Sequence, residues 1–287
     1  MRVISWNINS VRARLPRLLT VLRRHKPDVV CIQETKASNG GFPVMQLSAA
    51  GYNIVLHGQP SYNGVAILVR DHTRRCNLWA FDADDPHREV IGVASGPGLP
   101  TDVQRGFPGD PVPNEARVVS TCVGKLRLVN VYVVNGKARE SDQFKLKQYW
   151  MAAMGKWLQS LSKTPSLLVV GDFNVAPDDR DVWDPEGLRD RIHCTEEERS
   201  WLKEMQGNRL RDLLRVTTEK PGIYTWWPYK KDAFNRNEGL RFDLALGDDR
   251  VVDMVERVWV DREERRPVGR MGKPSDHAPV IIDLDAP

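Results

Sequence analysis

Apolar residues recur along the chain in short runs rich in β-branched side chains, and several of these runs end in polar residues. Runs of this length are typical of strands that are buried on both faces. The predicted strands are RVISW (2–6), DVVCIQ (28–33), GVAILV (64–69), RVVSTCV (117–123), LRLVNVYVV (126–134), SLLVVG (166–171), FDLALG (242–247) and PVIIDL (279–284).

Helical periodicity appears between these strands. Pro16 suits the start of a helix, and the leucines at 15, 18, 19 and 22 then share one apolar face. Residues 142–161 carry a second apolar stripe, and Thr195 with Glu198 forms a capping box before a third helix. Strands alternating with helices, without a linker-like stretch, predict a single α/β domain over residues 1–287, with two packed sheets covered by helices.

Two segments depart from the alternation. Residues 96–115 hold four glycines and five prolines, which predicts a long surface loop. The acidic stretch 178–198 is interpreted as connection plus exposed helix.

Composition narrows the class of protein. The 287 residues are 41% hydrophobic, enough for a sizeable core, and no apolar run approaches the roughly 20 residues of a membrane span. The first residues alternate apolar and polar too soon for a signal peptide, so we expect a cytoplasmic protein. Cys31, Cys76, Cys122 and Cys194 form no C-x-x-C pair, which predicts free thiols and neither a disulfide nor a zinc framework.

The net charge is only +4, but the cations are clustered. Seven of them precede the first acid, Asp28, and a second group at 262–273 leads into KPSDHAP. Such clusters favour an anionic partner. For Arg17, Arg23 and Arg24 we expect instead a solvated helix face.

Polar residues follow several predicted strands at the point where each strand ends. These are Asn7, Glu34, Asn135, Asp172 and Asn174. In a mixed sheet, strands that run the other way add the residues at their starts to the same edge. We therefore expect a single site composed of Asn7, Asn9, Glu34, Asp172, Asn174, Asp243, Asp276 and His277.

For each of these residues taken alone, a position in a turn, at a helix cap or on the surface with its hydrogen bonds satisfied is a simpler interpretation than a functional site. Several carboxylates in a small volume, however, repel one another unless a cation compensates their charge. Carboxylate and amide oxygens suit Mg²⁺, with Mn²⁺ as an alternative, and the lack of Cys and His clusters disfavours zinc. Glu34 is the first expected ligand of this cation.

Such a cation would polarise a phosphoryl oxygen. Asp172 is suited to be the base for an attacking water, and the side chains of Asn7, Asn174 and His277 can donate to phosphate oxygens. Asp243 can hold His277 in its tautomer and favour the cationic form. Tyr132 can donate to phosphate or to the leaving oxygen, although a buried tyrosine with a local hydrogen bond is the simpler interpretation.

The motifs SWNINSVRARL, IQETK, YNGVAIL, NVYVVNG, GDFN, YTWWPY, GLRFD and PSDHAP occur in an order that resembles the exonuclease III family of abasic-site DNA endonucleases. The resemblance runs from Arg2 to Leu284. IQET, GDFN and SDH alone would place the chain only in the wider endonuclease/exonuclease/phosphatase superfamily. The resemblance implies a four-layer α/β sandwich, with two mixed β-sheets between helices and the site at the sheet edges.

The resemblance also implies roles for individual residues. Tyr132, Asp172, Asn174, Asp243 and His277 match catalytic positions. The positions that match the metal site or its surroundings are Asn7, Glu34, Asp172, Asn174, Asp276 and His277. Whether Asp172, Tyr132 or a metal-bound water is the base, and whether one metal or two take part, stays open.

The segment 223–243 interleaves aromatic residues with lysines and arginines, a mixture suited to nucleic acid, although core packing explains about half of the aromatic residues. In the family, positions matching Trp226, Leu240 and Phe242 wall a pocket for a flipped abasic deoxyribose. Extrusion of a sugar without a base is cheap, because little pairing or stacking is lost. The residues expected to bind DNA or the abasic site are Asn9, Arg12, Asn63, Asn135, Trp226, Asn237, Leu240 and Phe242.

Three features differ from the family pattern. Val134 replaces a frequent proline, and Asn9 stands where some relatives carry an aspartate near the metal, so metal stoichiometry can differ. The loop 96–115 is longer than in compact members and could alter the grip on DNA or the exonuclease activity.

The leading hypothesis is a Mg²⁺-dependent hydrolase of DNA repair that cuts duplex DNA 5′ to abasic sites and acts on blocked 3′ ends as a 3′-to-5′ exonuclease and 3′-phosphodiesterase or phosphatase. We expect a monomer in the bacterial cytosol or nucleoid, without a membrane partner. A second hypothesis keeps the chemistry but changes the substrate to undamaged nucleic acid, a poly(A) tail or a phospholipid. A third is a non-catalytic DNA-binding protein, which the intact Glu34, Asp172, Asp276 and His277 disfavour.

Overall fold

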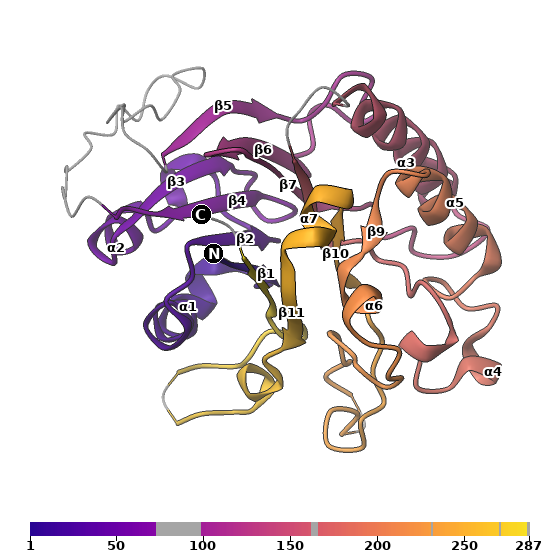
Figure 1. Cartoon of the computed structure of the whole chain (residues 1–287). Coiled ribbons are helices and arrows are strands. Elements are labelled where there is room, and N and C mark those ends of the chain that lie inside the picture. Colours follow the sequence, from indigo (N-terminus) through magenta and orange to yellow (C-terminus); the bar gives the residue numbers. More distant parts are fainter. Residues whose placement is uncertain (73–98, 162–165, 231, 270, 286–287) are drawn as a thin grey trace.

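The computed structural model describes residues 1–72, 99–161, 166–230, 232–269 and 271–285. Two mixed β-sheets of six strands each lie face to face (Figure 1). The first sheet has the order β11 (Val255–Val260), β12 (Val280–Leu284), β1 (Arg2–Asn7), β2 (Val29–Gln33), β4 (Val65–Arg70) and β3 (Tyr52–His57). The second has the order β5 (Pro100–Arg105), β6 (Val118–Val123), β7 (Leu126–Tyr132), β8 (Leu167–Asp172), β10 (Asp243–Gly247) and β9 (Arg211–Asp212).

Each sheet has a parallel pair near its centre, β1 with β2 and β7 with β8, and the other neighbouring pairs are antiparallel. The carboxyl ends of the parallel strands therefore reach the same edge as the starts of β10 and β12. This arrangement confirms the mixed sheets predicted from the sequence.

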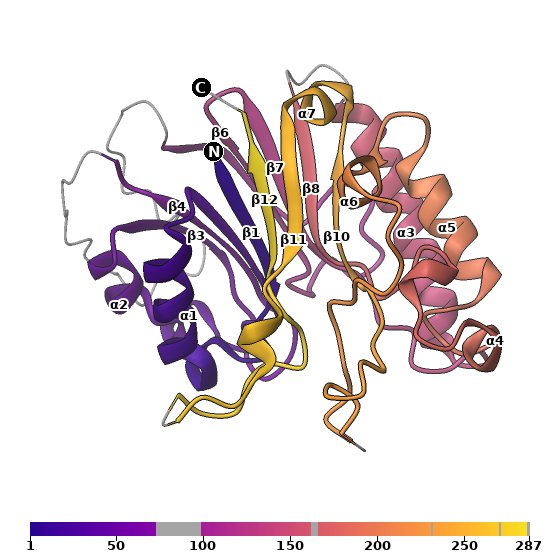
Figure 2. The same ribbon diagram turned by 60° about the horizontal axis from the view of Figure 1, so that its bottom comes forward.

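Helices cover the outer face of each sheet, which gives four layers (Figure 2). The helices α1 and α2 lie against the first sheet, and α3 and α5 against the second. The helices are α1 (Val11–His25), α2 (Val44–Ala49), α3 (Asp142–Ser160), α4 (Pro185–Leu188), α5 (Glu196–Gln206), α6 (Leu213–Thr217) and α7 (Asp249–Met254). Short 3₁₀ turns are η1 (Asn39–Gly41), η3 (Asp179–Asp181) and η4 (Arg262–Arg265).

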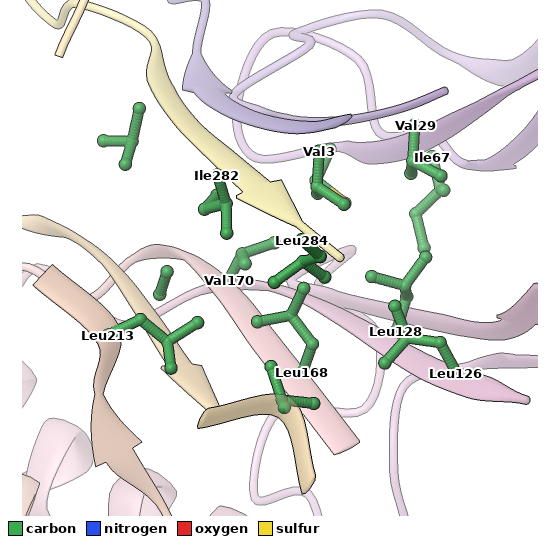
Figure 3. Packing of buried hydrophobic residues seen from close by; sticks show 14 of the residues in the cluster. Val3, Val29, Ile67, Leu126, Leu128, Leu168, Val170, Leu213, Ile282 and Leu284 are labelled. Carbon is green, nitrogen blue, oxygen red and sulfur yellow. The ribbon is translucent and has the colours of Figure 1, made fainter. Parts of the chain in front are cut away.

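The central strands are mostly apolar because both of their faces are buried. In β8, Leu168 and Val170 pack between the sheets, whereas Leu167 and Val169 pack under α3 and α5. The core between the sheets joins residues of both sheets, with Val3 and Ile282 facing Leu128 and Val170 across the gap (Figure 3). A side chain at the end of a central strand is thus held by packing on both sides.

All eight predicted apolar runs form strands, but four further strands were missed. These are β3, β5, β9 and β11, all four of which lie at sheet edges. Edge strands contact a sheet on one side only, so polar residues are tolerated and the apolar signal is weak. In β11, for example, Glu256 and Arg257 are exposed.

The prediction of a surface loop over residues 96–115 was wrong in part. Residues 100–105 form β5, an edge strand paired with β6, with an irregular register between Thr101 and Gln104. Pro100 is tolerated because it is the first residue of an edge strand, and Asp102 has φ 51° where the register shifts. Residues 96–98 of the predicted loop, like Cys76, lie outside the described residues.

The start of the first helix was also misplaced. Helix α1 begins at Val11, with Ser10 accepting a hydrogen bond from the Ala13 N–H as N-cap, and Pro16 lies inside the helix. Arg17, expected on a solvated face, is fully buried. Its guanidinium donates to the Glu264 carbonyl at 3.1 Å, a partner far along the chain that helical periodicity does not reveal.

Two acids in the stretch 178–198 are buried rather than exposed. Glu198 completes the predicted capping box with Thr195 and lies 2.6 Å from the buried Lys147 ammonium. Asp181 pairs with Arg241 at 2.6 Å. Buried carboxylates of this kind are tolerated because each meets a cation. Cys31 and Cys194 are buried, Cys122 is half-buried, and all three are free thiols, as expected.

Gly171, the residue before Asp172, is required by the close approach of β7. Its φ is +149°, and a Cβ atom there would lie 1.9 Å from the Val131 carbonyl oxygen. We expect Gly171→Ala to lower the free energy of unfolding by about 3 kcal/mol, because backbone must move to relieve the overlap. Urea unfolding measures this.

The matched control is Gly124→Ala. Gly124 also has a positive φ, +59°, but nothing lies within 4 Å of its Cβ position. It should cost only about 1 kcal/mol. Equal losses in the two variants would show that contact with β7 is not the reason for Gly171.

Candidate active site

Asn7, at the end of β1, connects the two sheets. Its Nδ2 atom donates to Glu34 Oε1 at 2.8 Å and to Asp172 Oδ2 at 2.9 Å. Glu34 follows β2 of the same sheet, whereas Asp172 ends β8 of the other. Strand-end residues from both sheets therefore meet at one edge.

Asp172 lies between the two other site residues that the second sheet provides. It is paired in register with Tyr132 of β7 on one side and with Asp243 of β10 on the other. The Asp172 carboxylate also accepts the Asn174 N–H at 2.9 Å. Three groups proposed for catalysis are therefore set by strand register rather than by loops.

His277 stands between two carboxylates. Its Nδ1 atom lies 2.8 Å from Asp243 Oδ2, and its Nε2 atom lies 3.8 Å from Asp172 Oδ2. The ring is buried, and its backbone carbonyl accepts the indole N–H of Trp6 at 3.2 Å. The arrangement directs Nε2 toward Asp172 while Asp243 fixes the other side of the ring.

Burial and charge together shift the pKa values here. Burial acts to lower the pKa of His277, but the carboxylates of Asp243 and Asp172 outweigh it and raise the value to about 10. Burial raises the pKa of Asp172 to about 7, against the opposing effect of His277. Burial, with the negative charges of Glu34 and Asp172, raises the pKa of Tyr132 well above 10. At neutral pH the edge therefore holds a cationic imidazole, a protonated phenol and a carboxyl near its titration point.

Asp276 is held by hydrogen bonds from Asn9 and Trp226. The Asn9 Nδ2 atom donates to Asp276 Oδ1 at 2.8 Å, and the Trp226 indole donates to Asp276 Oδ2 at 3.2 Å. Burial would raise the pKa of Asp276, but the charge of His277 and these hydrogen bonds keep it below its ordinary value. Asp276 is therefore an ionised carboxylate beside Asn9.

A cation already occupies the oxygen-rich corner between Glu34 and Asn9. The Lys36 ammonium lies 2.8 Å from Glu34 Oε2 and 2.7 Å from Asn9 Oδ1. The Lys36 ammonium therefore supplies positive charge where these two oxygens lie close together. A hard divalent cation fits the same donor set, because carboxylate and amide oxygens are its preferred ligands.

Amide oxygens are needed in that set. Within the ranges that the structure describes, no three His, Cys, Asp or Glu side chains come together as a metal-ligand group. A metal held here would therefore use one or two of the carboxylates Glu34, Asp172 and Asp276, and the amide oxygens of Asn7 and Asn9 could complete its ligands.

The backbone at this edge is strained at non-glycine residues. Asn9, Glu34, Lys36, Asn63 and Asn174 all have φ between 47° and 53°. A left-handed backbone at residues with a side chain costs free energy, and it concentrates at functional sites where surrounding structure enforces it. Here it aims Glu34 and Asn174 back at the strand ends that precede them.

Asn174 is more constrained than a freely available phosphate donor. Its Nδ2 atom donates to the Val133 carbonyl at 3.0 Å, and its Oδ1 atom accepts from Asn135 at 3.0 Å. The Lys147 ammonium donates to the Asn174 carbonyl at 2.7 Å. Asn135 is exposed, so this amide pair faces outward at the edge.

The other residues expected to contact DNA are spread around the site. Arg12 is exposed in the first turn of α1, and Asn237 is half-buried with φ 58°. Asn63 is 7% exposed, and its amide donates to Gln59 at 3.1 Å, so it does not project freely toward a ligand.

The three residues expected to wall the abasic pocket are in contact. The rings of Trp226 and Phe242 stack at 5.2 Å, and Leu240 packs in the same cluster. Phe242 is 2% exposed, and the ring of His193 lies 4.8 Å from it. His193 thus covers part of the expected pocket wall.

Sequence analysis missed three side chains at this edge: Lys36, Arg117 and His193. The guanidinium of Arg117 lies 5.0 Å from the ring centre of Tyr132. Lys36 could have been found from the lysine in IQETK, two residues after Glu34. Arg117 could have been found as the first residue of the predicted strand RVVSTCV, which starts at this edge. His193 carries no such signal, because only a folded loop brings it to the site.

No helix in the described parts of the chain is long and apolar enough to cross a membrane.

Comparison with known proteins agrees with this geometry. The sequence profile described as the endonuclease/exonuclease/phosphatase family matches residues 4–277. Exodeoxyribonuclease III of Haemophilus influenzae is 28% identical over 297 residues, covering 99% of this chain and all of that protein. The exodeoxyribonuclease of Bacillus subtilis is 24% identical, with 99% of this chain and 100% of that protein covered.

Solved structures give the same result. A 3′ phosphatase from Neisseria, bound to a product DNA hairpin, superposes with a TM-score of 0.86 at 34% identity, with both chains fully covered. An AP endonuclease from Archaeoglobus fulgidus has a TM-score of 0.85 at 28% identity, again over both whole chains.

Proposed function

The chain belongs to the endonuclease/exonuclease/phosphatase family and, within it, to the exonuclease III and AP endonuclease group, and from this we propose that it is a divalent-metal-dependent phosphodiesterase acting on damaged DNA. Its substrates are duplex DNA with an abasic site, cut on the 5′ side, and DNA ends blocked at the 3′ position. The observation that carries the proposal is the contact of Asn7 with both Glu34 and Asp172, beside the His277 ring.

Asp172 is the group best suited to accept a proton from water. Its pKa of about 7 places its titration near neutral pH, where a general base is most effective. Tyr132 is less suited, because its raised pKa keeps the phenol protonated and makes it a donor. We therefore assign the base role to Asp172 and the donor role to Tyr132.

The step is the attack of a water oxygen on phosphorus. The water loses its proton to Asp172, the bond from phosphorus to the 3′ oxygen breaks, and that oxygen takes up a proton to become a 3′-hydroxyl. The cationic His277 donates to the non-bridging oxygens, on which negative charge grows, while both Asn7 N–H groups hold Glu34 and Asp172 in place. His277 is kept cationic by Asp243, which holds it through Nδ1.

Glu34 and Asp276, with amide oxygens of Asn7 or Asn9, would hold the divalent cation; Mg²⁺ is the expected ion and Mn²⁺ the alternative. When bound, it supplies charge compensation to the phosphate and the leaving oxygen. A cation held by Glu34 and Asn9 would compete with the Lys36 ammonium, which contacts Glu34 Oε2 and Asn9 Oδ1.

Removal of divalent metal is expected to lower the cleavage rate by at least about 1,000-fold, because the metal supplies several kcal/mol of transition-state stabilisation. The assay is cleavage of a duplex with a single tetrahydrofuran residue, in EDTA and after Mg²⁺ or Mn²⁺ is restored. Undiminished cleavage in EDTA would rule out the metal-dependent chemistry.

Action at 3′ ends is favoured by one observation. Phe242 and Leu240, expected to receive a flipped sugar, are packed in one cluster, and the ring of His193 lies against Phe242. A 3′-terminal phosphate or nucleotide reaches the strand edge without entry of an internal sugar into this cluster. The Neisseria relatives at 34% identity are described as a 3′ phosphatase and a 3′-5′ exonuclease, which supports the same preference.

A gel assay that compares internal abasic, 3′-phosphate and blunt duplexes separates these activities. We expect removal of the 3′ phosphate to be the fastest of the three reactions. Competition by undamaged nucleic acid or phospholipid vesicles tests the alternative substrates. Tight binding of abasic DNA without any cleavage would instead support the non-catalytic hypothesis.

A further inference from the structure

The segment between β11 and β12 forms an arm, of which residues 261–269 and 271–279 are described. It projects from the end of the molecule that carries the strand-end site, next to residues 227–230 and 232–238 (Figure 2). Asp276 of the site lies on this segment, only three residues after Lys273. The arm is therefore continuous with the rim of the site.

Buried ion pairs fix the base of the arm on α1. Asp261 and Glu264 are 6% and 2% exposed, and Arg24 contacts their carboxylates at 3.0 Å and 2.9 Å. Arg17 donates from inside to the carbonyls of Arg266 at 3.0 Å and Gly272 at 3.1 Å. The Arg24 side chain of α1 thus neutralises two acids of the arm, and Arg17 binds the arm's backbone at two further residues.

Aromatic rings of the neighbouring loop hold the cations of the arm. Arg262 lies over the Phe234 ring at 5.2 Å, and Arg266 lies over the same ring at 5.8 Å. The Lys273 ammonium lies 3.5 Å from the ring centre of Tyr229. These contacts order the side chains in advance and so lower the entropy cost of binding an anion.

Arg14 joins this rim to the site. Its guanidinium donates to the Lys273 carbonyl at 3.2 Å, to the Tyr229 hydroxyl at 3.3 Å, and to the carbonyl of Asn9. Asn9 in turn binds Asp276. A continuous set of contacts therefore runs from the candidate metal corner to the exposed cations.

The exposed charge on the arm is mainly positive. Arg262, Arg266 and Lys273 are exposed, and the exposed acid among its described residues is Glu263, which pairs with Arg266 at 3.0 Å. That pair is open to solvent, at 57% and 68% exposure, so it is weak and a phosphate can replace Glu263.

We propose that the arm is a second DNA contact, in which Arg262, Arg266 and Lys273 bind backbone phosphates of the duplex flank next to the strand-end site. The inference rests on the proposed function and extends it to a surface outside the reacting groups. The strand-end site binds one phosphate of the duplex. Duplex DNA carries a charge about every 1.7 Å along its axis, so other phosphates of the same duplex lie close to the ordered cations of the arm.

The test is the salt dependence of DNA binding by the full chain in EDTA, measured by fluorescence anisotropy with a 3′-phosphate duplex. We expect the variant carrying Arg266→Gln and Lys273→Gln to reduce the slope of log Kd against log salt by about two, close to one per lost phosphate contact. The charge-conserving variant with Arg266→Lys and Lys273→Arg should keep the wild-type slope.

A second control removes two charges elsewhere, through Lys125→Gln and Lys156→Gln. Lys125 lies in the turn between β6 and β7, at the end opposite Tyr132, and Lys156 is exposed on α3. If the wild type binds DNA but the arm variant keeps the wild-type slope, the arm contact is wrong and the proposed function stands. The same conclusion follows if both glutamine variants lose the same amount of slope. Absence of salt-dependent binding by the wild type would overturn the proposed function with it.

Discussion

Asp172→Asn is expected to lower kcat for removal of a 3′ phosphate by about three orders of magnitude, while the protein stays folded and binds DNA. The amide keeps the shape of the carboxyl and can still contact Asn7, but it cannot accept the proton of the attacking water. Asp249→Asn, a change on α7 away from the site, is the matched control and should leave kcat unchanged. A variant at Asp172 that keeps more than a tenth of the wild-type kcat would remove this residue from the role of base.

The same variant should change how stability depends on pH. Because burial raises the pKa of Asp172 from 3.8 to about 7, the folded metal-free protein holds a proton between these values that the unfolded chain has released. The free energy of unfolding should therefore fall as pH rises from about 4 to about 7, a window set by the two pKa values. Urea unfolding in EDTA should show this fall in the wild type and a smaller one in Asp172→Asn.

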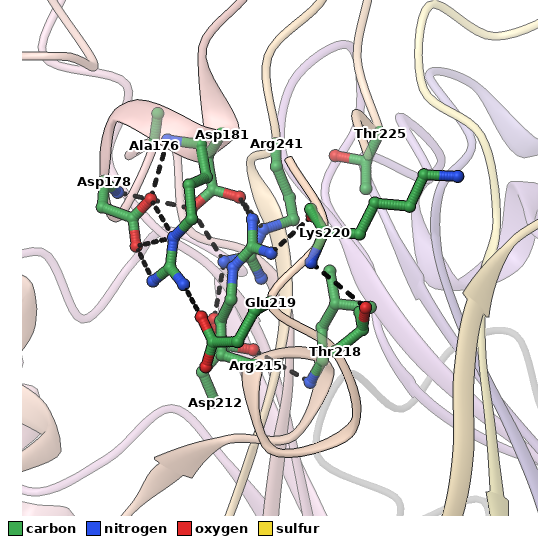
Figure 4. Close-up of polar contacts among 12 residues, drawn as sticks. Ala176, Asp178, Asp181, Asp212, Arg215, Thr218, Glu219, Lys220, Thr225 and Arg241 are labelled. Carbon is green, nitrogen blue, oxygen red and sulfur yellow. Dashed lines mark hydrogen bonds and ion pairs between the residues drawn. The ribbon is translucent and has the colours of Figure 1, made fainter. Parts of the chain in front are cut away.

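Asp181→Ala is expected to cost about 3–5 kcal/mol of stability. Asp181 is fully buried, and its two oxygens accept from Arg241 at 2.6 Å and 2.9 Å, while Arg215 contacts the same carboxylate (Figure 4). Arg241 also donates to Asp212 at 2.6 Å. Loss of Asp181 would leave buried positive charge with too few partners.

This network also supports the expected DNA-contacting cluster. The Arg241 N–H donates to the Asp181 carbonyl at 3.0 Å, and Leu240 and Phe242 flank Arg241 in sequence. The control is Glu263→Ala, whose pair with Arg266 is more than half exposed on both sides and should be worth less than about 1 kcal/mol. Urea unfolding compares the two. A loss below about 1 kcal/mol for Asp181→Ala would show that the guanidiniums find other partners.

Much of the fold could be predicted because its central strands are buried on both faces. The runs around Ile4, Val30 and Val169 have no polar alternation, and all form central strands. The four missed strands, by contrast, all lie at sheet edges: β5 and β11 are rich in polar residues, β9 has two residues, and β3, YNIVLH, is buried but holds only three aliphatic residues in a row. Their pairing partners, not their own residues, make them strands.

The site could be anticipated in outline for the same reason. Asn7, Asp172 and Asp243 each sit at an end of a predicted strand, so topology alone brings them to one edge. Side chains that arrive from loops or across long sequence separations could not be anticipated. Arg17 reaches a glutamate 247 residues away, and His193 reaches Phe242 through a turn that carries no apolar periodicity.

A crystal structure of Asp172→Asn with Mn²⁺ and a 3′-phosphate duplex would examine the shared site of metal and phosphate at the sheet edge. We expect an anomalous Mn²⁺ peak within about 2.3 Å of a Glu34 oxygen, with Lys36 displaced and the terminal phosphate beside Asn7 and His277. A Mn²⁺ peak bound elsewhere, or a phosphate far from His277, would contradict the shared site.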